Sequence, residues 1–271
     1  MPGEVCCGLE LSRPLCHLRL NRHQRPVETN IPIRIEELDY QTTSMGEISL
    51  RRRHDLELDA EIYEVKLGDE FLMSSMFTVA EIEMAHLGLA AAIGEDLSVL
   101  VGGLGLGYTA RAALADSRVR ELTVIEALAP VIDWHRRDLI PYAAELTGDP
   151  RASLVHGDFF ASMQSPESSE ASAHRDRYDV ILLDIDHSPN HLLHPAHADF
   201  YTPTGLSRLA DRLETSGVLA IWSNDPPDQD FLTVLGDVFE TTDSHVVSFP
   251  NPFQDTEATN TVYIAAMGPG S

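Results

Sequence analysis

Three glycines at alternate positions are the first residues in the chain whose type and spacing suggest chemistry. Gly103, Gly105 and Gly107 follow the apolar run 98–101 and precede a helix-like run that starts at Tyr108. Glycines at such a turn let the backbone approach a ligand closely, and the N-terminus of the following helix offers free N–H groups. The pattern indicates a nucleoside-binding corner. The alternative is that the glycines only allow a helix to pack tightly on a sheet.

An acidic residue stands where such a corner needs one. Glu126 ends the next apolar run, about 20 residues beyond the glycines, where a carboxylate accepts hydrogen bonds from ribose hydroxyls. The glycine spacing is GxGxG and not the GxGxxG of dinucleotide-binding proteins. We therefore expect an adenosyl ligand without a pyrophosphate, as in enzymes that use S-adenosylmethionine (SAM).

A second carboxylate, Asp158, lies in the sequence VHGDFF, directly after the third strand-like run of this region. It could accept a hydrogen bond from the adenine amino group, with Phe159 or Phe160 against the ring. The alternative is that Asp158 is a helix N-cap, a position at which Asp is common.

The sequence ILLDIDHSP provides the candidate catalytic residues. Asp184 ends a strand-like run, and ligands bind at the carboxyl ends of strands in open α/β sheets. A carboxylate there could orient or deprotonate an attacking amine. Asp186 and His187 follow, and His187 could also be the base. The alternative is an exposed turn built by Asp, Ser and Pro.

Alternating strand-like and helix-like runs must position these residues. From Ser98 on, apolar runs typical of buried strands alternate with runs of helical spacing. Continuous apolar strands linked by helices predict a parallel sheet that is covered on both faces. The last two strand-like runs, SHVVSFP and NTVYIAAM, are joined by a loop too short for a crossover, so we expect them to pair antiparallel.

Short alternating runs before this region predict an antiparallel meander with turns at Met45-Gly46 and Gly68-Asp69. The first residues mix Pro, Arg, His and Cys without a period and are interpreted as a flexible leader. The expected organisation is a leader over 1–30, a β-meander over 31–77 and an adenosyl-binding catalytic domain over 78–271.

The composition limits the classes of partner. The chain has 271 residues and a formal net charge of −24. Such an anionic surface repels nucleic acid and anionic membranes and attracts cationic substrates; alternatively, the acidity only keeps the protein soluble. No apolar run reaches the length of about 18 residues that predicts a transmembrane helix. The three cysteines, Cys6, Cys7 and Cys16, fit neither a disulfide framework nor a zinc set, so we expect a cytoplasmic protein.

Four histidines recur at spacings that could align on one helical face: His187, His191, His194 and His197. Imidazole groups can bind Zn, Ni or Cu, but a metal needs fixed geometry, and prolines interrupt any helix here. We therefore expect no metal, and we interpret this segment as a lid on the acceptor pocket. Trp222, at the end of the fifth strand-like run, is a further candidate for the pocket wall.

These features together resemble the spermidine synthase family of aminopropyltransferases over residues 33–266. The matching stretches are DYQ at 39–41, the glycine loop, TVIEA at 123–127, HGDFF at 156–160, YDVILLDID at 178–186, DFYTPTGLSRL at 199–209 and GVLAIWS at 217–223. The resemblance implies an α/β fold in which a seven-stranded Rossmann-like sheet of the SAM-methyltransferase type follows a small N-terminal antiparallel β-meander. It also implies SAM or decarboxylated SAM as co-substrate, ribose contact for Glu126, adenine contact for Asp158 and amine orientation for Asp184.

The chain departs from the family pattern at the polyamine motifs. Family members carry a loop like GGGDGG, whose Asp binds the aminopropyl ammonium group; the matching position here is Gly105. The family segment that contains Asp-Glu and Tyr reads MSSMFTVAEIEMAH here, without Tyr, and the family sequence DSSDP reads DIDHSP. The chain therefore matches the family better at the residues of the nucleoside pocket than at those of the polyamine site.

Three functions follow from these observations. The first is a transferase that moves a methyl or alkyl group of SAM to a small molecule, with a cationic amine as the expected acceptor. The second is a true aminopropyltransferase, in which Glu81, Glu83 or Asp186 replaces the missing loop Asp. The third is a non-catalytic adenosyl-binding scaffold. An edge of the meander could also pair two copies into a homodimer.

Overall fold

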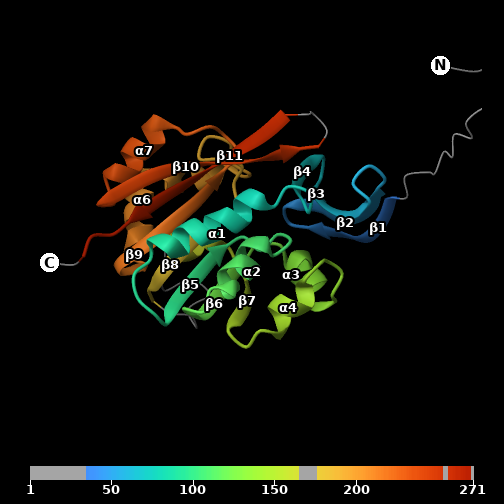
Figure 1. Cartoon of the computed structure of the whole chain (residues 1–271), viewed down its shortest axis with the longest axis horizontal. Coiled ribbons are helices and arrows are strands. Elements are labelled where there is room, and N and C mark those ends of the chain that lie inside the picture. Colours follow the sequence, from blue (N-terminus) through green and yellow to red (C-terminus); the bar gives the residue numbers. More distant parts are fainter. Residues whose placement is uncertain (1–34, 165–175, 253–255, 270–271) are drawn as a thin grey trace, which may run out of the picture. The chain divides into compact units, whose positions relative to one another are not determined.

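A computed structural model describes residues 35–164, 176–252 and 256–269. The described residues belong to one compact unit that contains two β-sheets (Figure 1). The predicted leader over 1–30 and the three cysteines lie outside the described residues. Among the described residues, no helix is both long enough and apolar enough to cross a membrane.

The N-terminal sheet is an antiparallel meander with the strand order β1-β2-β3-β4. Ile48 and Leu50, two residues apart on β2, lie on the same face of the sheet and are fully buried. Gly68 sits in the turn after β3 with a φ of +59°. The strands are β1 (Ile35–Thr43), β2 (Gly46–Asp55), β3 (Ala60–Leu67) and β4 (Glu70–Ser74).

The larger sheet has seven strands in the order β10-β11-β9-β8-β5-β6-β7. β5 to β9 run parallel, while β11 pairs antiparallel with both β9 and β10. The predicted fold class is therefore confirmed, including the antiparallel end. The strands are β5 (Leu97–Gly102), β6 (Val119–Glu126), β7 (Ala152–His156), β8 (Tyr178–Leu183), β9 (Leu213–Ser223), β10 (Thr241–Asn251) and β11 (Thr256–Ala266).

Helices cover both faces of this sheet, which explains why its parallel strands are continuously apolar. Val99 and Val101 pack into a core with helices α1 to α4, and Leu100 between them packs into a second core with α5 to α7. The helices are α1 (Val79–Ala91), α2 (Tyr108–Ala115), α3 (Ala129–Arg136), α4 (Ala143–Gly148), α5 (Phe159–Gln164), α6 (Pro203–Ala210) and α7 (Gln229–Gly236), with the 3-10 helix η2 (Pro195–Tyr201).

Two runs of helix-like sequence, 129–146 and 200–214, do not form single helices in the structure. Between α3 and α4, Asp138 and Tyr142 adopt φ angles of +54° and +62°, which an α-helix does not allow, and Pro141 lacks the N–H that a helix needs. The other break comes between η2 and α6. There the side chain of Thr202 accepts a hydrogen bond from the Gly205 N–H at 3.2 Å and caps the new helix.

Polar contacts attach the meander to the larger sheet. The buried Trp134 on α3 donates its Nε1–H to Asp39 of β1 at 2.7 Å, and Arg137 lies 3.3 Å from the same carboxylate. His187, after β8, lies 3.0 Å from Glu70 of β4. These contacts place the meander at the carboxyl ends of the parallel strands, where α/β sheets bind ligands.

Candidate functional site

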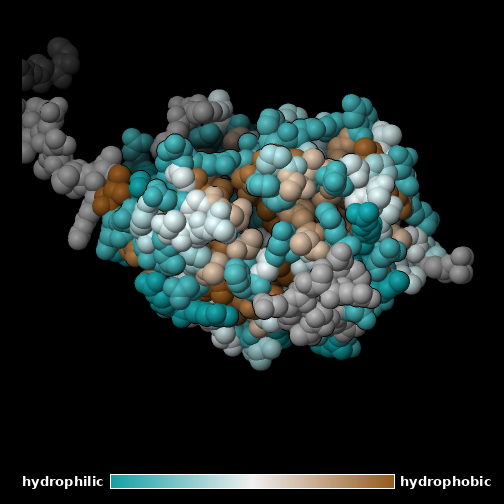
Figure 2. All heavy atoms as spheres, turned by 180° about the vertical axis from the view of Figure 1, so that it is seen from behind, coloured by the Kyte–Doolittle hydropathy of each residue, from teal (hydrophilic) through white to brown (hydrophobic). Residues whose placement is uncertain are grey.

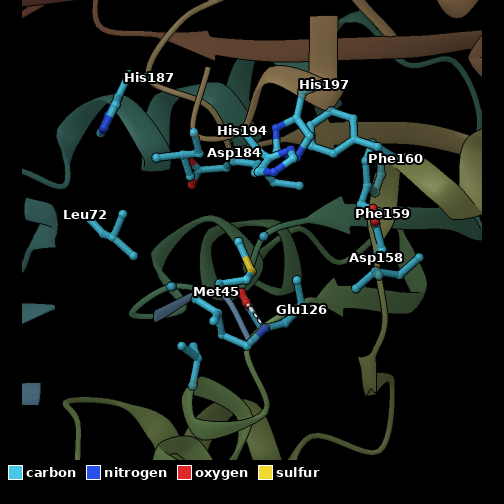
Figure 3. Close-up of a pocket in the computed structure, with 18 of the residues that line it drawn as sticks. Met45, Leu72, Glu126, Asp158, Phe159, Phe160, Asp184, His187, His194 and His197 are labelled. Carbon is cyan, nitrogen blue, oxygen red and sulfur yellow. Dashed lines mark hydrogen bonds between the residues drawn. The ribbon is translucent and has the colours of Figure 1, made fainter. Parts of the chain in front are cut away.

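A cavity of ≈ 510 Å³ lies at the carboxyl ends of β5, β6 and β8 (Figure 3). Its size falls within the range of small-molecule sites. The meander contributes apolar side chains to its wall, and the segment from 187 to 197 contributes several histidines. Figure 2 shows hydrophilic residues over most of one face of the molecule and hydrophobic residues in its central hollow.

The glycine loop forms one wall of the cavity. Gly103 has a φ of +90° and passes so close to the carbonyl oxygen of Asp184 that a Cβ atom would collide with it. Gly105 has a φ of +48°, and a Cβ atom there would lie 2.6 Å from the sulfur of Met73. Gly107 is the N-cap of α2 and does not line the cavity, unlike the other two.

Glu126 holds the glycine loop against β6. Its two carboxylate oxygens accept hydrogen bonds from the backbone N–H groups of Leu104 and Leu128, each at 2.8 Å. Burial raises the pKa of Glu126, and the backbone hydrogen bonds oppose this effect. The carboxylate lines the cavity at the position that the sequence predicts for a ribose contact.

Asp158 both caps a helix and faces the cavity. Its Oδ1 accepts a hydrogen bond from the Ala161 N–H at 3.1 Å, in the first turn of α5, as the N-cap alternative predicts. Asp158 also lines the cavity together with Phe159 and Phe160. The two interpretations are therefore compatible. Phe159 is 2% exposed and packs under Gly102, where a Cβ atom would lie 2.7 Å from its ring.

Asp184 and Glu81 form a pair of carboxyl groups on the opposite side of the cavity from Asp158. The hydroxyl of Thr109 donates to Asp184 Oδ2 at 2.8 Å. Burial, and then the charge of Asp184, raises the pKa of Glu81 to about 8. Burial raises the pKa of Asp184 to about 6; the Thr109 hydrogen bond opposes this shift, and the charge of Glu126 adds to it. The pair thus keeps a proton near neutral pH.

Glu81 does not appear among the main site residues that the sequence predicts; it appears there only as one substitute for the missing loop Asp. Of the three substitutes, Glu81 lines the cavity. Glu83 instead pairs with His86 on α1 at 3.2 Å. The sequence shows that Glu81 is an acidic residue near the start of a helix, but it does not show whether the side chain faces the cavity.

Asp186 lies outside the cavity, in contrast to the other two predicted catalytic residues. Its buried carboxylate accepts hydrogen bonds from the Leu193 N–H at 2.7 Å and from the Tyr201 hydroxyl at 2.9 Å, and it lies 2.8 Å from His197 Nδ1. It is therefore an anchor for the segment that follows β8. His187 does line the cavity, at the side where it contacts Glu70.

Two histidines of the predicted lid segment line the cavity, His194 and His197. The sequence does not distinguish them from His191, which lies 2.9 Å from Asp225 instead. In the described part of the chain, no group of three or more His, Cys, Asp or Glu side chains is arranged to hold a metal ion.

Carboxyl groups are the most numerous ionisable groups of the cavity wall. Four carboxyl groups line it, those of Glu81, Glu126, Asp158 and Asp184, and none of the described lining residues is Lys or Arg. Carboxyl groups without a cationic partner favour a positively charged ligand. The apolar wall residues suit its hydrocarbon part: Met45, Val65, Leu72, Met73, Ile125, Leu128, Val131 and Trp222.

Comparison with known proteins identifies the fold. No protein-family model matches the chain, and no curated protein matches its sequence. Two solved spermidine synthases match its structure: one in complex with the transition-state analogue AdoDATO, with a TM-score of 0.64, and one from Thermotoga maritima, with a TM-score of 0.63. Each is 18% identical to the chain, and each match covers 86% of this chain and 73% of the other. The chain therefore has a spermidine-synthase-like fold.

Proposed function

We propose that the protein is a transferase that takes a methyl or alkyl group from an adenosyl sulfonium compound, SAM or decarboxylated SAM, and moves it to a small amine. The observation that carries this proposal is the cavity at the carboxyl ends of the strands, which has acidic groups at both ends and no Lys or Arg among its described lining residues. A sulfonium donor and an ammonium acceptor are both cations that such a wall attracts.

The residues of the wall fit the parts of the donor. Glu126 retains free lone pairs beside its two backbone hydrogen bonds and would accept from the ribose hydroxyls. Asp158 and Phe159 would meet the adenine. Gly103 and Gly105 would let the loop backbone approach the rest of the donor closely.

Asp184 is the group that we assign to the reaction. The acceptor binds as an ammonium ion and must first lose a proton, which the Asp184 carboxylate accepts. The neutral amine nitrogen then attacks the carbon bound to sulfur, the C–S bond breaks with its electron pair going to sulfur, and a neutral thioether leaves. A positioned base of this kind contributes about 10²–10⁴-fold to a rate. A pKa of about 6 keeps Asp184 mostly ionised at neutral pH and able to take the proton.

Glu81 favours the second candidate, transfer of an aminopropyl group from decarboxylated SAM. Gly105 supplies no carboxylate for the aminopropyl ammonium group, and Met73 fills the space where a side chain would lie. Glu81, beside Asp184, offers a carboxyl group to the same cavity from α1. Ordinary SAM carries an additional carboxylate, for which the described cavity wall offers no Lys or Arg.

The direct test measures the melting temperature with SAM, decarboxylated SAM and methylthioadenosine. A ligand at about 100 times its Kd adds about 2.7 kcal/mol of stability. We expect a shift with at least one sulfonium compound, and the larger shift identifies the donor. Product formation with a panel of amines must then depend on Asp184. No shift with any of the three would contradict the proposal, and binding with no turnover would favour the scaffold.

A further inference from the structure

His197 is the lining residue whose surroundings define its hydrogen-bonding role most clearly. Its Nδ1 lies 2.8 Å from the buried carboxylate of Asp186, and its ring stacks on Phe160 with centroids 3.9 Å apart and planes 27° apart. Both contacts fix the plane of the imidazole. Asp186 in turn accepts hydrogen bonds from the Leu193 N–H and the Tyr201 hydroxyl, which fix the position of its carboxylate.

The contact with Asp186 also determines which nitrogen of the neutral ring carries the proton. A carboxylate only accepts hydrogen bonds, so Nδ1 must be the donor, and Nε2 is left with a free lone pair. His197 lines the cavity with 14% of its side chain exposed. The ring nitrogen available to a ligand is therefore an acceptor.

His197 lies on the side of the cavity that Asp158 and Phe160 occupy, away from Asp184 and His187 (Figure 3). Asp158 is a second acceptor there. Two acceptors match the two N–H groups of an exocyclic amine, whereas a keto oxygen at the same place would face two lone pairs and be repelled.

We propose that His197, oriented by Asp186, recognises the 6-amino group of the bound purine together with Asp158, so that the site selects adenosyl over inosyl ligands. This inference rests on the proposed adenosyl ligand and deepens it. Asp186 is a positioning residue in this account, because it acts through His197.

The test compares methylthioadenosine with methylthioinosine, its 6-keto analogue, by calorimetry. Both are uncharged at the sulfur, so the Glu81–Asp184 pair contributes little to the difference. A built hydrogen-bonding site discriminates strongly, and we expect the native protein to prefer the adenosine by about 100-fold. His197→Phe keeps a ring against Phe160 and should lower this ratio about tenfold.

His194→Phe is the matched control. His194 lines the same cavity, 5.8 Å from His197 between ring centroids, but its Nδ1 accepts from the Ala196 N–H and its tautomer is not set by Asp186. We expect this variant to leave the ratio unchanged. For the positioning residue, Asp186→Ala should lower the ratio, and Asp186→Asn, which keeps an acceptor for Nδ1–H, should restore it.

The two proposals fail in different ways. An unchanged ratio in His197→Phe, or an equal loss in His194→Phe, would overturn the role of His197 while leaving the adenosyl site intact. Absence of binding of both nucleosides to the native protein would overturn the proposed function and this inference with it.

Discussion

The two ends of the cavity contain the same chemical group in different surroundings. At one end, Glu126 receives two backbone N–H groups at 2.8 Å. At the other, Asp184 receives the Thr109 hydroxyl, and Glu81 has its own backbone N–H. Burial raises the pKa of all three carboxyl groups, and the hydrogen bonds oppose this shift. Both oxygens of Glu126 are held by the loop backbone, whereas pKa values of about 8 and about 6 let Glu81 and Asp184 take or release a proton near neutral pH.

The largest expected effect comes from removing the charge of Asp184. Asp184→Asn keeps the shape and the contact with Thr109 but abolishes the base, so we expect kcat to fall about 10²–10⁴-fold. The affinity for methylthioadenosine, which lacks the aliphatic amine of the acceptor, should stay within a few fold. A steady-state assay measures kcat, and calorimetry measures the affinity. An unchanged kcat would show that Asp184 is not the base.

The next largest effect is a loss of stability in Glu126→Gln. Glu126→Gln replaces one acceptor oxygen by an NH₂ group that faces a backbone N–H, which leaves a buried donor unsatisfied. We expect the free energy of unfolding without ligand to fall by about 1–3 kcal/mol. Urea denaturation measures this change. If the variant were as stable as the native protein, Glu126 would not be holding the loop.

Glu81→Gln is expected to have a smaller effect on stability, and at high pH it should raise the stability. The pKa of Glu81 is raised from 4.5 to about 8, so the folded state keeps a proton that the unfolded state has already lost. The associated stability is present below pH 4.5 and is lost as the pH rises through about 8. Glu81→Gln should therefore melt higher than the native protein at about pH 9 but not at about pH 4. Glu83→Gln, on the same helix, is the control that should not show this crossover.

The order of the elements and the glycine–acid corner follow directly from sequence periodicity. Apolar runs of strand length and helical spacing depend on local geometry, so β5, α2 and β6 could be predicted, together with Gly103 and Glu126. Local geometry also predicts that Asp184, next to the end of β8 at Leu183, reaches the sheet edge.

The remaining features depend on contacts between distant parts of the chain. Asp186 follows Asp184 by two residues, but the strand has ended, so the alternation of strand faces no longer applies and its side chain turns into the protein. Glu81 meets Asp184 because α1 packs against β8, which ends just before Asp184. The tautomer of His197 depends on Asp186, eleven residues earlier.

The most direct test of the central claim is the number of protons released when decarboxylated SAM binds. Calorimetry near neutral pH in buffers of different ionisation enthalpy measures this number. If the ammonium group binds between Glu81 and Asp184, it displaces the proton of the pair, and we expect a release of about one proton that disappears in Glu81→Gln. Binding without proton release, or the same release in both proteins, would contradict the claim that this acidic pair receives a cation.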